Sequence, residues 1–156
     1  GADAVVTGAL TEAGAIDRDA LSRLIGAAEG GSRIVFHRAL DVCADIDAGF
    51  DMLAELGVGR VLTSGGEPMA LAGATVLRRL RERGEGRTDV LPAGGIRASN
   101  AREILNATGC EALHLGPRRT SVDPTTSRRG VDYGTHTVCD DDAVGAVVRA
   151  LRDQAR

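Results

Sequence analysis

A histidine, an arginine and an aspartate fall within five residues of one another in the sequence. The run Arg33 to His37 predicts a short strand that ends at His37, and Arg38 and Asp41 follow it directly. In parallel α/β folds, ligands bind at the carboxyl ends of the strands. There, His37 could bind a metal or transfer a proton, Arg38 could hold an anion, and Asp41 could orient either of them. The same residues could instead form an ion pair and a helix cap.

Two glycine-containing turns are candidate anion sites. Thr63-Ser64-Gly65 follows another predicted strand, and small residues there let backbone N–H groups approach an anion closely. Gly94-Gly95, followed by Arg97, comes just before a predicted helix, whose N-terminus would favour phosphate. Alternatively, the glycines only meet the backbone demands of tight turns.

The candidate metal ligands are His37 and Cys43. Cys43 is the thiol nearest to a predicted ligand-end loop, and thiolate with imidazole favours Cu(I). His114, between two leucines, is either a hydrogen-bonded core residue or a ligand beside His37. Cys110 and Cys139 read as ordinary small apolar residues, and the lack of a CxxC pair predicts reduced thiols.

Short apolar runs alternate with amphipathic stretches, as in repeated βα units. Strands are predicted at 4–7, 33–37, 60–63, 90–92 and 112–115. Helices are predicted at 17–28, 47–56, 69–83, 100–107 and 141–152. Asp17 should cap the first helix, Ser99 or Asn100 the fourth, and Gly57 and Gly84 should end helices in the left-handed conformation.

These elements predict an α/β fold with about five parallel βα units, spaced like those of a (β/α)₈ barrel. We expect a single domain over residues 1–156, with a long loop over 117–138 that holds the pairs Arg118–Arg119 and Arg128–Arg129. Those arginines could bind phosphate or carboxylate. An open five-stranded sheet is the structural alternative, and its exposed edges would predict a homo-oligomer.

Composition narrows the classes of function. A net charge of −3 with interspersed signs argues against nucleic acid or a membrane surface as partner. No apolar run is long enough to span a bilayer, and the N-terminus lacks a signal-peptide pattern, so a cytoplasmic location is expected. All 19 basic residues are arginine, which excludes a Schiff-base lysine from this segment. Without a Walker-type loop, we expect no nucleotide cofactor.

Five segments, taken in order, resemble the strand-end motifs of the CutC family. They read GADAVVTGALT, IVFHRALDVCAD, LGVGRVLTSGGEP, LPAGGIRASN and ALHLGPR. The resemblance implies strands four to eight of a TIM barrel, with the first three strands absent, and a role in copper homeostasis with copper binding. It also implies site residues, namely His37, Arg38, Asp41, Thr63, Ser64, Gly65, Gly94, Gly95 and His114.

The sequence leaves three functions open. The first is a copper homeostasis protein that holds Cu(I) through thiol and imidazole groups. The second is a barrel enzyme that acts on a small phosphorylated or carboxylated metabolite, with His37 as general acid or base. The third is a chain that has lost its activity and acts only with a partner.

Overall fold

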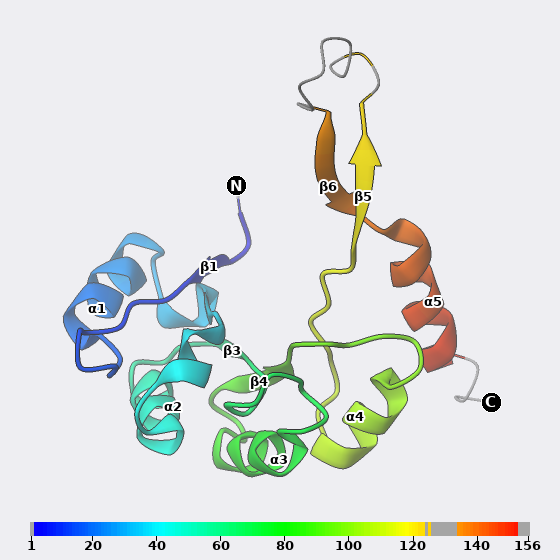
Figure 1. The fold of residues 1–156 in the computed structure, drawn as a ribbon. Coiled ribbons are helices and arrows are strands. Elements are labelled where there is room, and N and C mark those ends of the chain that lie inside the picture. The colour runs from blue at the N-terminus through cyan, green and yellow to red at the C-terminus, as the bar shows by residue number, and fades with distance from the viewer. Residues whose placement is uncertain (1, 124, 126–133, 153–156) are drawn as a thin grey trace.

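The computed structural model describes residues 2–123, 125 and 134–152. Within this part of the chain, four parallel strands form one sheet in the order β1-β2-β3-β4 (Figure 1). The strands are β1 (Val5–Thr7), β2 (Ile34–Phe36), β3 (Arg60–Thr63) and β4 (Asp89–Pro92). The α-helices are α1 (Arg18–Ala27), α2 (Ile46–Glu55), α3 (Ala74–Arg83), α4 (Ala101–Thr108) and α5 (Asp141–Arg152), with 3-10 helices η1 (Gly31–Arg33) and η2 (Arg38–Val42). The α/β class and the first four strands are confirmed.

Helices α1 to α4 form an arc along one side of the sheet (Figure 1). Every second strand residue faces them, so Val61 and its parallel neighbour Val90 lie buried under the helices. The core packs α2 and α3 against the strands. Its largest fully buried side chains are Phe36, Phe50, Leu21, Ile34, Leu40, Leu53, Leu77, Leu80 and Ile104.

The opposite face of the sheet is open. Val6, Val35, Leu62 and Leu91 line a cavity of about 680 Å³ on this side, which we call the inner-face cavity. Val6 is 60% exposed, whereas Val61 is fully buried. One face of the sheet therefore contributes most of its packing energy.

The predicted fifth strand is reduced to one bridge. His114 pairs with Ala93 in the parallel sense, and His114 N donates to Pro92 O at 2.9 Å. The prediction of a strand over 112–115 is thus too long. No described strand pairs with its far side, so only one ladder of hydrogen bonds holds it, and Gly116 and Pro117 follow at once.

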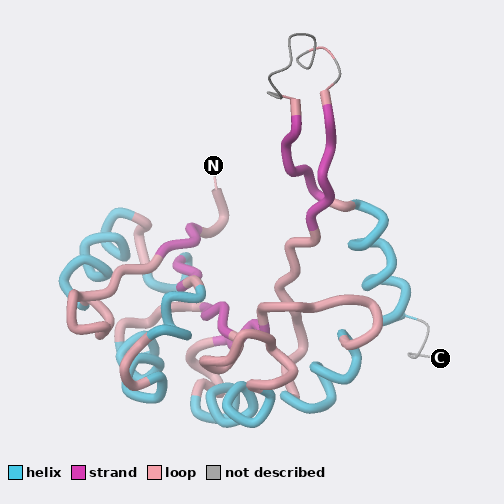
Figure 2. The backbone as a smooth tube through the Cα atoms, in the orientation of Figure 1, coloured by secondary structure: helices cyan, strands magenta, loops and turns pink. Residues whose placement is uncertain are grey.

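The prediction of a loop over 117–138 is also wrong. Strands β5 (Arg118–Val122) and β6 (Thr135–Cys139) form an antiparallel hairpin that points away from the sheet (Figures 1 and 2). Both strands are rich in β-branched residues, which favour extended structure: Thr120 and Val122 in β5, and Thr135, Thr137 and Val138 in β6. Arg128–Arg129 lies outside the described residues.

Two of the predicted helix-capping residues, Asp17 and Gly57, have the expected geometry, and Gly84 does not. Asp17 Oδ1 accepts from Ala20 N at 2.8 Å, as expected of an N-cap, and Gly57 has a φ of +72°. Gly84 is not left-handed, with a φ of −86°. A Cβ there would collide with Thr88 O and with the Phe50 ring, so close packing requires this glycine.

Helix α3 begins later than predicted, at Ala74 instead of Met69. Residues 69–73 form turns, and Gly73 lies so close to Ser64 O that no Cβ would fit. No helix in the described part of the chain is long and apolar enough to cross a bilayer.

The two faces of the sheet predict different costs for one substitution. Val61→Ala should lower the free energy of unfolding by about 2–3 kcal/mol, because it leaves a cavity under the helices. Val6→Ala should cost less than about 1 kcal/mol, because that side chain is mostly exposed. Urea unfolding of both variants checks this. Equal losses would contradict it and show that the inner face is covered in solution, as a homo-oligomer would require.

Candidate functional site

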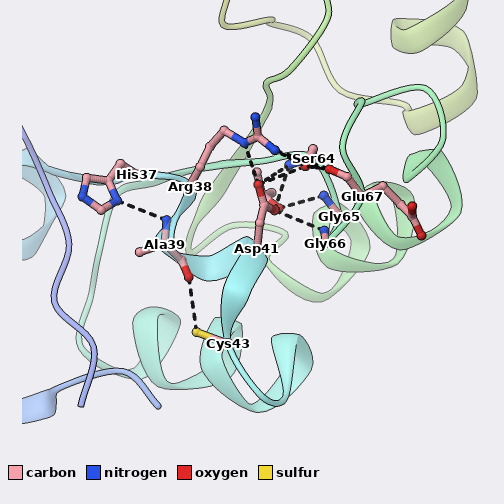
Figure 3. Close-up of polar contacts among 10 residues, drawn as sticks. His37, Arg38, Ala39, Asp41, Cys43, Ser64, Gly65, Gly66 and Glu67 are labelled. Carbon is pink, nitrogen blue, oxygen red and sulfur yellow. Dashed lines mark hydrogen bonds and ion pairs between the residues drawn. The ribbon is translucent and has the colours of Figure 1, made fainter. Parts of the chain in front are cut away.

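The carboxylate of Asp41 lies buried between two loops. Its side chain, 6% exposed, extends from η2 to the turn after β3 (Figure 3). Oδ1 accepts from the Thr63 hydroxyl, from Ser64 N at 3.0 Å and from Gly66 N at 3.1 Å. Oδ2 accepts from Arg38 Nε at 2.7 Å and from Ser64 Oγ at 2.9 Å. Asp41 therefore ties the loop after β2 to the loop after β3.

These hydrogen bonds determine the charge of Asp41. Burial by itself raises the pKa of a carboxyl group, because it disfavours the charged form. Hydrogen bonds from Thr63, Arg38, Gly66 and Ser64 together outweigh burial and hold the pKa of Asp41 below its ordinary value. Asp41 is therefore ionised at neutral pH.

The turn Thr63-Ser64-Gly65 holds an internal anion. Its hydroxyls and Ser64 N donate to Asp41, and Gly65 N donates to Thr63 Oγ1 at 2.9 Å. The sequence predicts an external anion at this turn, and the structure corrects that prediction. A carboxylate of the same chain already occupies the place, and Ser64 and Thr63 are fully buried.

Arg38 connects Asp41 to a neighbouring pocket. Its Nε donates to Asp41, while Nη2 donates to Ser64 Oγ at 2.7 Å and to Glu67 O at 3.4 Å. These bonds fix the plane of the guanidinium group. The remaining nitrogen, Nη1, lies beside Gly94, where an added Cβ would come within 3.2 Å of it. Among the described residues, Nη1 has no hydrogen-bond acceptor, whereas Nε and Nη2 do.

A cavity of about 710 Å³ gathers three arginines and a glycine pair at the ends of the strands. We call it the arginine pocket. Its lining includes Arg38, Gly94, Gly95, Arg97, His114, Arg118, Asp140 and Val147. The acidic residue of this lining, Asp140, accepts from Ala143 N at 3.0 Å and so caps the start of α5. Positive charge therefore predominates.

The Gly94-Gly95 turn needs its glycines. Their φ angles are +109° and +65°, a region that other residues rarely adopt. A Cβ on Gly95 would also collide with the end of the Met69 side chain. Asn100 braces the turn, because its side chain accepts from Arg97 N at 2.8 Å and donates to Gly95 O at 3.0 Å. Asn100 precedes α4 as predicted, but its side chain supports the turn and not the helix.

The structure does not bring His37 and Cys43 together. His37 lines the inner-face cavity, whereas Cys43 lines a separate cavity next to α2. The thiol donates to Ala39 O at 3.6 Å, and His37 Nδ1 accepts from Ala39 N, so the two side chains reach Ala39 from different directions (Figure 3). Burial and the nearby charge of Asp41 raise the pKa of Cys43, which disfavours the thiolate.

Copper does not fit the donor groups of the described residues. None of those residues forms a cluster of three or more His, Cys, Asp or Glu side chains. Cys110 is buried and Cys139 is exposed on β6, distant from each other in the chain. The predicted metal pair therefore lacks the shared geometry that a Cu(I) site requires.

Two residues that shape the site, Gly8 and Asn100, were not predicted from the sequence to do so. Gly8 follows β1, and a Cβ there would collide with the ring of His37, so this glycine makes room for the imidazole. Asn100 holds the Gly94-Gly95 turn. In the sequence they are only a glycine after a strand and an asparagine three residues after Arg97, and neither pattern identifies the group that the residue contacts.

The hydrogen bonds of Asp41 predict a large and pH-dependent contribution to stability. At pH 7, Asp41→Asn should lower the free energy of unfolding by about 2–4 kcal/mol, because an amide nitrogen would face donors. The folded-state pKa of Asp41 is lowered, so its contribution persists at neutral pH and is lost only as the pH falls below about 4.

Urea unfolding of both proteins at pH 7 and pH 3 tests this. The matched control is Asp47→Asn, which breaks an exposed ion pair with Arg79 and should cost less than about 1 kcal/mol. A constant gap between Asp41→Asn and the parent across this pH range would contradict the assignment.

Comparison with known proteins agrees with this architecture. The model of the CutC family matches residues 1–118. A family protein CutC of Treponema denticola is 40% identical over 135 residues, covering 86% of this chain and 54% of the relative. A copper homeostasis protein cutC homolog of Homo sapiens is 41% identical over 120 residues, covering 77% of this chain and 44% of the relative.

A solved structure is also similar. The crystal structure of the putative copper homeostasis protein CutC from Streptococcus agalactiae superposes with a TM-score of 0.66 at 32% identity. It covers 72% of this chain and 55% of the other. The chain spans about half the length of the curated relatives that it matches. Because the family model covers most of the sequence and the relatives share about 40% identity, this chain belongs to the CutC family.

Proposed function

We propose that the arginine pocket binds a small anion that carries a phosphate or carboxylate group. The observation that carries this proposal is the convergence of Arg38, Arg97 and Arg118 with the Gly94-Gly95 backbone in one cavity. Arginine suits both anions, because its planar fork matches their oxygen atoms. The ligand class is therefore a small phosphorylated or carboxylated metabolite.

We also propose that the four strands and the bridge at His114 correspond to strands four to eight of a TIM barrel. Parallel order, helices on one side and similarity to a longer CutC structure support this placement. In such barrels the loops after strands seven and eight often hold phosphate. On this numbering Gly94-Gly95 follows the seventh strand, and Pro117 and Arg118 follow the eighth.

The names of the relatives refer to copper homeostasis, and we carry that role to this chain as a proposal. Within the described residues, the donor groups support anion binding better than metal coordination. We therefore propose that this part of the protein contributes a ligand site, and not copper ligands, to that role. The reaction, if the complete protein catalyses one, would act on the anion held here.

Phosphate should stabilise the protein through this pocket. At ten times its Kd, phosphate should add about 1.4 kcal/mol to the free energy of unfolding and raise the melting temperature. Arg97→Gln and Gly95→Val should abolish the shift, the first by removing a charge and the second by blocking the turn. Thermal unfolding with phosphate, and with chloride at equal ionic strength, measures this effect.

Arg23→Gln is the matched control, because Arg23 is exposed on α1 far from the pocket along the chain. This variant should keep the full response to phosphate. An equal shift in chloride, or the same shift in Arg97→Gln, would contradict specific binding.

A Cu(I) titration separates the anion proposal from the copper hypothesis, under which Cys43 and His37 both hold the ion and loss of either one weakens binding. In an anaerobic competition with a chromophoric chelator, Cys43→Ser and His37→Ala should each leave the Cu(I) affinity of the chain unchanged, because the two groups line separate cavities. Cys139→Ser controls for binding by the exposed thiol of the hairpin. Tight one-to-one binding that both substitutions weaken would show that this chain has a metal site.

A further inference from the structure

The ring of His37 is held in one orientation. Its Nδ1 accepts a hydrogen bond from the backbone N–H of Ala39 at 3.1 Å, so His37 caps η2 (Figure 3). The ring also lies against the Gly8 backbone, where a Cβ would come within 2.7 Å of Nδ1. On another side it contacts the Phe36 ring, with 5.8 Å between centroids. A flip of the imidazole would lose the hydrogen bond from Ala39.

This orientation determines the tautomer. A backbone N–H can only donate, so Nδ1 must offer its lone pair to Ala39. In the neutral ring the proton is then on Nε2. His136 shows the reverse arrangement, because its Nδ1 lies 2.8 Å from Gly134 O, which can only accept. The two histidines should therefore be opposite tautomers.

The Nε2–H of His37 is available to a ligand. Nδ1 carries the one side-chain hydrogen bond of His37 within the described residues. His37 lines the inner-face cavity together with Arg38 and His114, and both of those residues also line the arginine pocket. The cavity that His37 lines therefore adjoins the arginine pocket through Arg38 and His114, so that a ligand held in the pocket can extend toward the imidazole.

We infer that His37 is a specificity-determining hydrogen-bond donor, which selects ligands with a second oxygen acceptor beside the anionic group. The inference rests on the proposed anion site. The ligand class narrows to small oxo acids or hydroxy acids and their phosphorylated equivalents, whose neutral oxygen would accept from Nε2. The same tautomer also explains why His37 is a poor copper ligand, since Nε2 carries a proton where a metal needs a lone pair.

Histidine NMR tests the tautomer directly. The chain has three histidines, so long-range ¹H–¹⁵N correlations of the rings are easily assigned with His37→Gln, His114→Gln and His136→Gln variants. At pH 8.5, where histidine is neutral, His37 should show the proton on Nε2 and His136 on Nδ1. A proton on Nδ1 of His37 would overturn the inference, whatever the result for anions.

Matched ligands test the selectivity. We would compare pyruvate with propionate, acetoacetate with butyrate, and 4-oxopentanoate with pentanoate, because the distance from the anion to the second oxygen increases along the series. In the pair whose spacing matches the distance from the anion to His37, the oxo acid should bind about tenfold more tightly than its unsubstituted partner. One added hydrogen bond accounts for a difference of that size. His37→Ala should remove that preference, His37→Gln should restore part of it, and His136→Ala should leave it intact.

The outcomes separate the two proposals. If phosphate and all six acids leave the His114 resonances and the melting temperature unchanged, the anion site itself fails, and the donor role of His37 fails with it. If the anions bind but no oxo acid is preferred, or the preference survives in His37→Ala, only the inference about His37 is overturned.

Discussion

The structure depends on one buried charge. Asp41 is almost fully enclosed, and a carboxylate in that position is tolerated only when it is paired and hydrogen-bonded. The guanidinium of Arg38 and the donors of the turn after β3 supply that compensation. The same bonds set the direction of Arg38 and hold two strand-end loops side by side. Removing the charge would take away one of the bonds that orient Arg38, which lines the candidate ligand pocket.

The open face of the sheet explains how the rest of the site is arranged. Helices cover one face, and the side chains there form a continuous core. On the other face, Val6 and its neighbours border a cavity, and the relatives are about twice as long. Residues at the rim, such as His37 and His114, are therefore positioned by hydrogen bonds and backbone contacts more than by packing.

Hydrogen bonding also separates an anion site from a metal site in this chain. His37 offers Nδ1 to a backbone N–H, and Cys43 donates to a backbone carbonyl and has a raised pKa. The Nδ1 atom of His37 and the thiol of Cys43 are thus both hydrogen-bonded within their own loop. Within the described part of the chain, Arg38 Nη1 and the exposed guanidinium of Arg97 have no such hydrogen bond. These arginine nitrogens favour a ligand with several oxygen acceptors, such as a phosphate or a carboxylate.

By itself, the sequence determined the βα order and the positions of four strands to within one residue. Those features are local, because apolar runs, caps and glycines act over a few residues. The spacing of His37, Arg38 and Asp41 also marked them as candidate site residues, which they remain. The fifth strand and the β5-β6 hairpin were misjudged, since a strand's extent depends on the partners beside it.

Only the tertiary structure decided what each candidate contacts. Thr63, Ser64 and Gly65 were predicted to hold an external anion, but in the fold Thr63 and Ser64 donate to Asp41, which is 22 or more residues away in the chain. Cys43 and His37, six residues apart, reach separate cavities. The physical reason is that hydrogen bonds and burial depend on distances across loops. The sequence determines which groups are present, and the packing of strands determines which of them remain free.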